Sequence, residues 1–171
     1  MVNGLFAGKF LPPHKGHKFA ILKAKKKCDK LYLVVGYEPN VTKDLCAKAG
    51  FPIITLQQRV NWWKEELKNE KDIIILGEDE TGIPAYPEGW KVWSERTQNL
   101  VKEKIDFIFG SELDYAPFYK QYFKESTYIL QDENREINPI SSTKIRANLK
   151  ENYHWIIDSA KPFFENLLNK K

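Results

Sequence analysis

Short apolar runs alternate with longer segments of helical periodicity along most of this chain, and this alternation limits the folds open to it. The apolar runs predict strands at residues 4–7, 31–35, 73–76, 105–109 and 128–130. Between them, apolar side chains recur at helical spacing over residues 16–27, 56–70 and 90–104. Apolar strands that alternate with helices are typical of a parallel sheet with helices on both faces. We therefore predict an α/β fold built on a parallel five-stranded sheet.

Shorter elements complete the pattern, with helices predicted at residues 114–123, 143–148, 152–159 and 161–168. Pro117 is tolerated only in the first turn of the first of these helices. The polar segment 132–140 predicts a loop, after which Ser141 or Ser142 caps the next helix. Because no repeat, low-complexity tract or linker interrupts the chain, a single domain over residues 1–171 is expected.

The charge balance bears on the partners of the protein. The 27 Lys and Arg residues against 23 Asp and Glu give a net charge of +4. This mild excess suits anionic metabolites but lacks the dense basic face of a nucleic-acid binder. The Lys-rich run at residues 23–30 is expected to be the solvated face of the first helix. We therefore predict no nucleic-acid partner.

Membrane and secretion signals are not expected. No apolar run approaches the roughly 20 residues of a membrane span, and the first strand begins almost at Met1, leaving no room for a signal peptide. Cys28 and Cys46 have neither CxxC nor metal-ligand spacing, so they are predicted to be free thiols in a reduced compartment. The chain is therefore predicted to be cytoplasmic, with no membrane partner.

The turn between the first strand and the first helix carries the strongest chemical signal, a G-x-F-x-P-x-H-x-G-H pattern over residues 8–17. Backbone N–H groups and the helix dipole favour an anion at such a turn. Gly8 lets the backbone approach a ligand, and Gly16 leaves space between the imidazoles of His14 and His17. Beside a polyphosphate, both imidazoles are expected to have raised pKa values.

Other phosphate and metal motifs do not fit this turn. A P-loop needs G-x-x-x-x-G-K-[ST], but the chain is one residue short of that spacing and has Phe10 after Lys9. HExxH, nearby Cys ligands and GxGxxG are also missing, so neither zinc nor a Rossmann dinucleotide motif is predicted. The acidic run at residues 78–80 is expected to be a solvated loop rather than a metal site.

A second polyanion site is predicted at residues 140–146, with the sequence ISSTKIR. It places three hydroxyls at a helix start and a lysine and an arginine on the first turn. Since a guanidinium is a fixed, planar phosphate clamp, each arginine of the chain is a candidate, namely Arg59, Arg96, Arg135 and Arg146.

The HxGH turn and the ISSTxIR segment, in this order and on this strand–helix pattern, resemble the nucleotidylyltransferase superfamily. Further stretches are similar to the nicotinamide-mononucleotide adenylyltransferase domain of the NadR family: PAYPEGWKVWS at residues 84–94, Ser111-Glu112 with Ala116-Pro117, and KPFF at residues 161–164. The resemblance covers essentially the whole chain. It implies a Rossmann-like nucleotidylyltransferase fold with C-terminal helices, without the kinase domain of NadR-type proteins, which needs its own P-loop.

Carried over by position, the resemblance implies a set of ATP-binding residues. His14 and His17 would contact the phosphates, and Arg146 would counter charge on the departing pyrophosphate, so these three form the implied catalytic set. The other ATP-binding residues would be Gly8 and Phe10 through their backbone, Ser111 and Glu112 near the adenosine, and Ser141, Ser142 and Thr143 on the triphosphate.

On the acceptor side, the resemblance implies that Lys9 meets a substrate phosphate and that Arg59 reaches the mononucleotide. Trp90 would stack on the nicotinamide ring, whereas Trp93 is expected in the core because aromatics at i and i+3 usually pack there.

The implied reaction is adenylyl transfer from ATP to nicotinamide mononucleotide, which gives NAD and pyrophosphate. Magnesium is expected to arrive with ATP, and the site residues include no metal ligand. Three alternatives stay open: a cytidylyltransferase, a pantetheine-phosphate adenylyltransferase, and a non-catalytic sensor of NAD or another nucleotide. The choice between nicotinamide and nicotinic acid mononucleotide is also open, as is the formation of a homo-oligomer.

Overall fold

A computed structural model describes residues 1–132 and 135–170. Its centre is one five-stranded sheet in which every neighbouring pair of strands is parallel, in the order β3-β2-β1-β4-β5. The strands are β1 (Asn3–Gly8), β2 (Lys30–Tyr37), β3 (Ile73–Asp79), β4 (Phe107–Gly110) and β5 (Thr127–Leu130). All five predicted strands are confirmed, with ends shifted by up to three residues. The strand order reverses between β1 and β4, which is where parallel sheets of this kind bind ligands.

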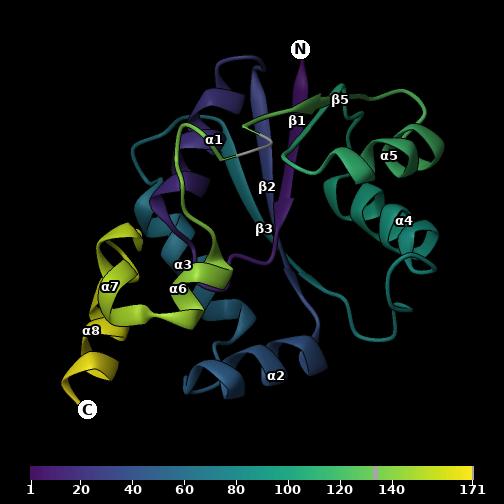
Figure 1. The fold of residues 1–171 in the computed structure, drawn as a ribbon. Coiled ribbons are helices and arrows are strands. Elements are labelled where there is room, and N and C mark those ends of the chain that lie inside the picture. Colours follow the sequence, from purple (N-terminus) through teal and green to yellow (C-terminus); the bar gives the residue numbers. More distant parts are fainter. Residues whose placement is uncertain (133–134, 171) are drawn as a thin grey trace.

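Helices cover both faces of the sheet (Figure 1). In the view of Figure 1, α1, α3, α6, α7 and α8 lie on one side, α4 and α5 lie on the other, and α2 lies below the carboxyl ends of the strands. Their bounds are α1 (Lys15–Lys25), α2 (Pro39–Ala49), α3 (Leu56–Glu66), α4 (Trp90–Val101), α5 (Ala116–Tyr122), α6 (Ser142–Ala147), α7 (Leu149–Asn152) and α8 (Lys161–Asn169). Two short 3₁₀ turns span Leu113–Tyr115 and Tyr153–Trp155.

The alternation of side chains along β1 divides the interior into two cores. Leu5 is fully buried in the core under α4 and α5, whereas Phe6 is buried in the larger core on the other face. The larger core also contains Trp63 of α3 and Phe164 of α8, both fully buried. Strand β1 is therefore packed on both of its faces.

Three helical segments differ from the prediction, and one of them is the short helix α7, which was not predicted. Helix α2 was not predicted, although Glu38 caps it by accepting a hydrogen bond from the Val41 N–H and Gly50 ends it with φ 73°. The helix predicted at residues 152–159 is wrong: a 3₁₀ turn ends at Trp155, and Ile156 is extended. Ile156 and Ile157 are both fully buried, and Ile156 bridges to His14.

Among the described residues, no helix is long and apolar enough to cross a membrane.

Candidate active site

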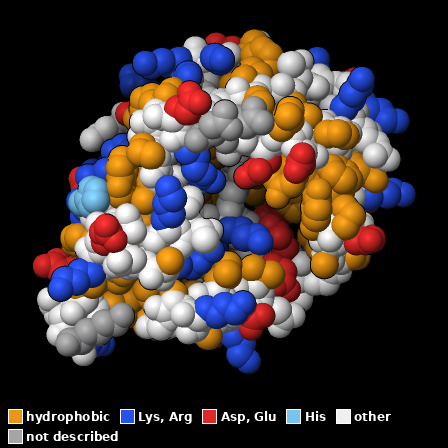
Figure 2. Space-filling model, viewed as in Figure 1, with side chains coloured by type: hydrophobic (Ala, Val, Ile, Leu, Met, Phe, Trp, Pro, Cys, Tyr) orange, Lys and Arg blue, Asp and Glu red, His pale blue; other side chains and the backbone are white. Residues whose placement is uncertain are grey.

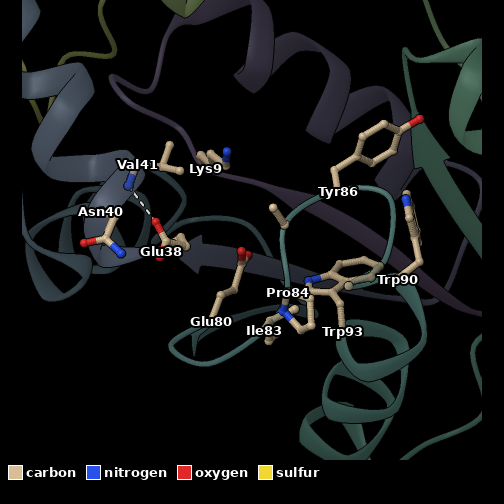
Figure 3. A pocket seen from close by; sticks show the side chains of 12 residues that line it. Lys9, Glu38, Asn40, Val41, Glu80, Ile83, Pro84, Tyr86, Trp90 and Trp93 are labelled. Atoms are coloured by element: carbon tan, nitrogen blue, oxygen red, sulfur yellow. Dashed lines mark hydrogen bonds between the residues drawn. The ribbon is translucent and has the colours of Figure 1, made fainter.

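Three cavities adjoin one another beyond the carboxyl ends of the strands. The aromatic cavity, of about 630 Å³, lies between the start of α2 and the segment that leads into α4 (Figure 3). The central cavity, of about 550 Å³, shares Lys9, Glu80, Tyr86, Trp90 and Trp93 with it and extends to His17 and Arg146. The histidine cavity, of about 60 Å³, lies between His14, His17 and the end of β4. Figure 2 shows this face hollowed near its centre, with Lys and Arg side chains along one side and hydrophobic side chains along the other.

The turn from β1 to α1 forms the floor of the central cavity. Phe10 takes a positive φ of 52° and buries its ring. A Cβ on Gly8 would lie 2.9 Å from that ring, so glycine is required there to make room for Phe10. Gly8, Lys9 and Phe10 all line the central cavity.

Arg59 holds this turn from below. Its Nη1 donates to the carbonyl oxygens of Lys9, at 2.5 Å, and Gly36, at 3.2 Å, and its guanidinium lies 5.6 Å from the centre of the Tyr37 ring. The side chain is fully buried and lines none of the three cavities. Burial lowers the pKa of Arg59 to about 10, so the group stays protonated at neutral pH. The geometry therefore links Arg59 to the site through the backbone of Lys9, and not directly as the resemblance implied.

Helix α6 holds the same turn from the other side. Arg146 donates from Nη1 to the Leu11 carbonyl at 2.7 Å and from Nη2 to Thr143 Oγ1 at 3.3 Å, and the Ser142 hydroxyl donates to the Pro12 carbonyl at 2.9 Å. Ser142, Thr143 and Arg146 all line the central cavity. The structure thus brings the second predicted motif onto the first, although Ser142 and Pro12 are 130 residues apart in sequence.

Ser141 is used differently from its two neighbours. Its hydroxyl accepts the Lys144 N–H at 3.1 Å and so caps α6. It lies outside the lining of the three cavities, so its geometry supports a capping role more directly than a ligand contact.

His14 and His17 form a reciprocal pair at the start of α1. The backbone N–H of each residue donates to Nδ1 of the other, at 3.1 and 3.2 Å, and the two rings stack with centres 3.5 Å apart. Since both Nδ1 atoms accept, the proton of each neutral ring lies on Nε2. A Cβ on Gly16 would lie 2.9 Å from the His14 ring, which agrees with the predicted need for space there. Both imidazoles therefore present Nε2–H donors.

The protein by itself lowers the pKa values of both histidines. Burial, with the nearby charge of Arg135, lowers the pKa of His14 to about 3. Burial, His14 and Arg135 also lower the pKa of His17 well below its usual value. The predicted rise therefore depends on a bound polyphosphate. His14 is only 1% exposed, and its Nε2 has no hydrogen-bond partner within the described part of the chain.

Arg135 is a site residue that was considered among the arginines but not assigned a role. It lines both the histidine cavity and the central cavity. Its position at the end of a polar loop before the second motif was the available signal. Arg96, by contrast, is exposed, donates to the Thr81 carbonyl and lines none of the cavities.

The end of β4 places Ser111 in the histidine cavity and Glu112 in the central cavity. The Glu112 carbonyl accepts a hydrogen bond from the Tyr128 hydroxyl at 2.8 Å, which ties this segment to β5. These two residues therefore flank the histidine pair on the β4 side.

The aromatic cavity contains both tryptophans of α4. Trp90 is the more deeply buried, at 8% exposure, and stacks on Phe118 with ring centres 5.0 Å apart and planes 6° apart. Trp93 was predicted to be a core residue, but it is only half-buried and lines the cavity beside Trp90 (Figure 3). Both rings are thus available to the cavity, and the exposed Tyr86 lies on the same side of it, with Lys9 and Glu38 across from these rings (Figure 3).

The prediction that residues 78–80 form a solvated loop is wrong for two of them. Glu78 and Asp79 end strand β3. Glu78 is buried, accepts hydrogen bonds from Thr97 Oγ1 at 2.8 and 3.1 Å, and has its pKa raised to about 7 by burial. Glu80 lines the aromatic and central cavities, and burial raises its pKa. Within the described residues, no three His, Cys, Asp or Glu side chains are grouped to hold a metal ion.

Comparison with known proteins gives a family and several relatives. The model of the cytidylyltransferase-like family matches residues 5–148. Two curated relatives are the trifunctional NAD biosynthesis/regulator proteins NadR of Escherichia coli strain K12 and Salmonella typhimurium strain LT2. Each is 33% identical over an alignment of 167 residues that covers 94% of this chain and 40% of the relative. The chain therefore spans less than half the length of these relatives.

Solved structures extend the similarity to the fold. A crystal structure of NadR in complex with NAD and AMP-PNP is 25% identical, with a TM-score of 0.73 over 95% of this chain and 46% of its own. NadR in complex with NR is 27% identical, with a TM-score of 0.72 over 92% of this chain and 43% of its own. A bifunctional NMN adenylyltransferase/ADP ribose pyrophosphatase from Francisella tularensis is 18% identical. It shares the fold, with a TM-score of 0.72 over 98% of this chain and 50% of its own.

Proposed function

Because the chain belongs to the cytidylyltransferase-like family of nucleotidyltransferases, we propose that it transfers the adenylyl group of ATP to nicotinamide mononucleotide. The products are NAD and pyrophosphate. The observation that carries this proposal is the union of two cavities at Lys9, one lined by His17, Arg146 and hydroxyls and the other by aromatic rings. A polyphosphate suits the first lining and a planar ring the second. The similarity to NadR proteins, which are named for NAD biosynthesis, supports the same reaction.

The reaction is an in-line displacement at the α-phosphorus of ATP. An oxygen of the mononucleotide phosphate forms a bond to that phosphorus, and the bond to the bridging oxygen breaks, so its electron pair leaves with pyrophosphate. A phosphate monoester has a second pKa of about 6 and is largely dianionic at neutral pH. No general base or covalent nucleophile is needed, and positioning with charge stabilisation accounts for catalysis.

The phosphate chain of ATP lies in the central cavity. His17 donates to it from Nε2 in that cavity, and His14 donates from the adjoining histidine cavity. The backbone of Gly8 and Phe10 approaches the phosphate chain, and Arg146 neutralises charge on the departing pyrophosphate. The hydroxyls of Ser142 and Thr143 assist there, with Ser141 capping the helix that carries them. Ser111 and Glu112 lie on the adenosine side, beyond β4.

The acceptor enters the aromatic cavity. Lys9 meets its phosphate at the junction of the two cavities, Arg59 holds the backbone of Lys9, and the nicotinamide ring packs against Trp90 and Trp93. Magnesium arrives as part of the MgATP substrate, where it is held mainly by phosphate oxygens and water.

The decisive experiment measures pyrophosphate release with ATP or CTP against nicotinamide mononucleotide, nicotinic acid mononucleotide and phosphopantetheine. We expect the highest kcat/KM with ATP and nicotinamide mononucleotide. Preference for CTP or for phosphopantetheine would contradict the proposal, and tight NAD binding without turnover would favour a sensor.

The catalytic assignment is tested by His17→Ala and Arg146→Ala. Removal of a preorganised charge-stabilising donor costs about 10²–10³ in turnover, so each variant should lose at least that much. His154→Ala is the matched control, because this third histidine is exposed and lines none of the three cavities. Full activity in folded His17→Ala would contradict the assignment.

A further inference from the structure

Arg135 occupies the junction between the histidine cavity and the central cavity, and it lines both. Its backbone has a positive φ of 53°, and its Nη1 donates to the Ile140 carbonyl at 3.0 Å. This hydrogen bond holds one edge of the guanidinium and fixes its direction. The fork geometry of a guanidinium leaves further N–H donors for a phosphate.

The charges around Arg135 favour an anion at this junction. In the central cavity the cations are Lys9, Arg135 and Arg146, and the carboxylates are Glu80 and Glu112. In the histidine cavity the one carboxylate among the described lining residues is Asp132. Its two oxygens already accept the N–H groups of Ile137 and Asn138, at 3.2 and 3.3 Å. None of the ion pairs of the described residues includes Arg135, although its charge helps to lower the pKa of Asp132.

A second observation points to a ligand at the same place. His14 is 1% exposed and lines the histidine cavity with Arg135, yet its Nε2 has no hydrogen-bond partner in the described part of the chain. A buried donor without a partner costs about 1–3 kcal/mol, so such a group is usually satisfied by a ligand or water. The imidazole and the guanidinium thus offer donors to one anionic group.

We propose that Arg135 contacts the α-phosphate of the bound nucleoside triphosphate and stabilises the charge that develops there during transfer. This inference rests on the proposed function, which places the adenosine on the side of Ser111 and Glu112, beyond β4, and the departing pyrophosphate beside Arg146 in the central cavity. The phosphate that joins the adenosine to the pyrophosphate is the α-phosphate, and Arg135 is the arginine that lines both the histidine cavity and the central cavity.

The same guanidinium has an effect on the imidazoles. Its positive charge opposes protonation of His14 and His17 and keeps them as neutral Nε2–H donors in the free protein. Removal of the charge should therefore raise the pH at which these histidines titrate, whereas Arg135→Lys keeps the charge and should leave it nearly unchanged.

The test compares Arg135→Met, Arg135→Lys and the control Lys15→Met. Lys15 is exposed, follows His14 directly in sequence and lines none of the cavities, so its variant removes the same charge without touching the junction. We expect Arg135→Met to lose about 100-fold in kcat. Arg135→Lys should recover about tenfold of that loss and remain about tenfold below wild type, and Lys15→Met should stay within twofold of wild type.

Two further measurements test whether Arg135 contacts phosphate or only supports the fold. The first of them does not depend on which acceptor the enzyme uses. Binding of AMP-PNP, measured by calorimetry without any acceptor, should weaken at least tenfold in Arg135→Met. NMR titration should show the histidine midpoints raised in that variant alone. If nicotinamide mononucleotide proves to be the wrong acceptor, the AMP-PNP measurement still tests Arg135.

Wild-type kcat and AMP-PNP affinity in a folded Arg135→Met would overturn the proposal. If this variant does not fold, Arg135→Lys decides. A folded Arg135→Lys with weakened AMP-PNP binding and reduced kcat supports the contact, and wild-type constants in that variant refute it.

Discussion

At the scale of single residues, the two histidines of the β1–α1 turn have little freedom. Each Nδ1 accepts a backbone N–H of the other residue, and the rings stack 3.5 Å apart. Helix capping therefore uses the Nδ1 side of each imidazole, and the proposed phosphate contact uses the Nε2 side. A side chain that only caps, such as asparagine, would keep α1 and lose the Nε2 donor.

His14 should make stability depend on pH in a predictable direction. Its pKa of about 3 in the folded protein lies below the unfolded value of 6.5. Between these values the unfolded chain binds the additional proton, so the free energy of unfolding falls as the pH is lowered from about 6.5, by about 1.4 kcal/mol per pH unit. His14→Asn should lack this contribution.

Urea unfolding of wild type and His14→Asn at pH 7, 6 and 5 measures this difference. We expect the difference in free energy of unfolding between wild type and His14→Asn to change in favour of the variant each time the pH is lowered. His154→Asn, at an exposed histidine, is the control and should follow wild type. Parallel curves for wild type and His14→Asn would show that His14 titrates normally.

At the scale of elements, Glu78 at the end of β3 should make stability depend on pH in the opposite direction to His14. Burial raises the pKa of Glu78 to about 7, above its ordinary value of 4.5. The folded protein then binds the additional proton between these values. The stability that Glu78 contributes is present below pH 4.5 and is lost as the pH rises through 7.

The stability of Glu78→Gln relative to wild type should therefore increase with pH. The amide stays neutral, so its free energy of unfolding should rise relative to wild type by about 1.4 kcal/mol per pH unit between pH 4.5 and 7. Glu95→Gln, on the exposed face of α4, is the matched control and should show no such trend. A constant difference between Glu78→Gln and wild type over this range would disprove the titration.

In helix α4, Trp93 is a better position than Trp90 for testing the proposed acceptor site in the aromatic cavity. Truncation of the buried Trp90 to alanine would cost about 3–5 kcal/mol of stability and confuse binding with folding. Trp93 is half-buried and lines the same cavity. Trp93→Leu should raise the acceptor KM about tenfold, a typical stacking contribution of about 1.4 kcal/mol, with the KM for ATP within twofold.

Steady-state kinetics with each substrate varied in turn measures the two KM values. Trp155→Leu is the control, because Trp155 is also half-buried but lines none of the three cavities. Equal effects on both KM values in Trp93→Leu would place the acceptor ring elsewhere.

Elements with strong local signals were predictable. Each strand is an apolar run, and α1, α3 and α4 follow helical periodicity, so the three-layer fold could be derived from pattern alone. Helix α2 has a weaker signal, because only Thr42 and Cys46 are buried along it. The error at residues 152–159 has a tertiary cause: Ile156 pairs with His14 at the far end of the chain, and no local pattern records that contact.

At the scale of the whole molecule, the site depends on contacts that local sequence does not report. Both motifs of the candidate site were recognised in the sequence, but the backbone contacts of Arg59 and Arg146 to the β1–α1 turn were not predicted. The burial of Glu78 was not predicted either, because a run of acidic residues does not indicate that one of them is hydrogen-bonded to Thr97. Such features arise only when the layers assemble.

The C-terminal helix should contribute strongly to global stability. Phe164 is fully buried, with ring centres 5.5 Å from Phe51 and 5.8 Å from Trp62. Phe164→Ala should lower the free energy of unfolding by about 3–5 kcal/mol. Phe163→Ala, at the adjacent half-buried aromatic, should cost less. Denaturant unfolding of both variants tests this order, and equal losses would contradict it.

The hydrogen bonds that hold the β1–α1 turn also bear on the order of events during synthesis. The turn is translated well before the residues that hold it. The carbonyls of Leu11, Pro12 and Pro13 accept hydrogen bonds from Arg146, Ser142 and Ile157, respectively, and cannot form them until those residues have been made. Contacts of such long sequence separation close late in folding. On the ribosome, the motif that is translated first is therefore among the last to reach its working shape. A nascent chain should stay unable to bind nucleotide until this C-terminal segment has emerged.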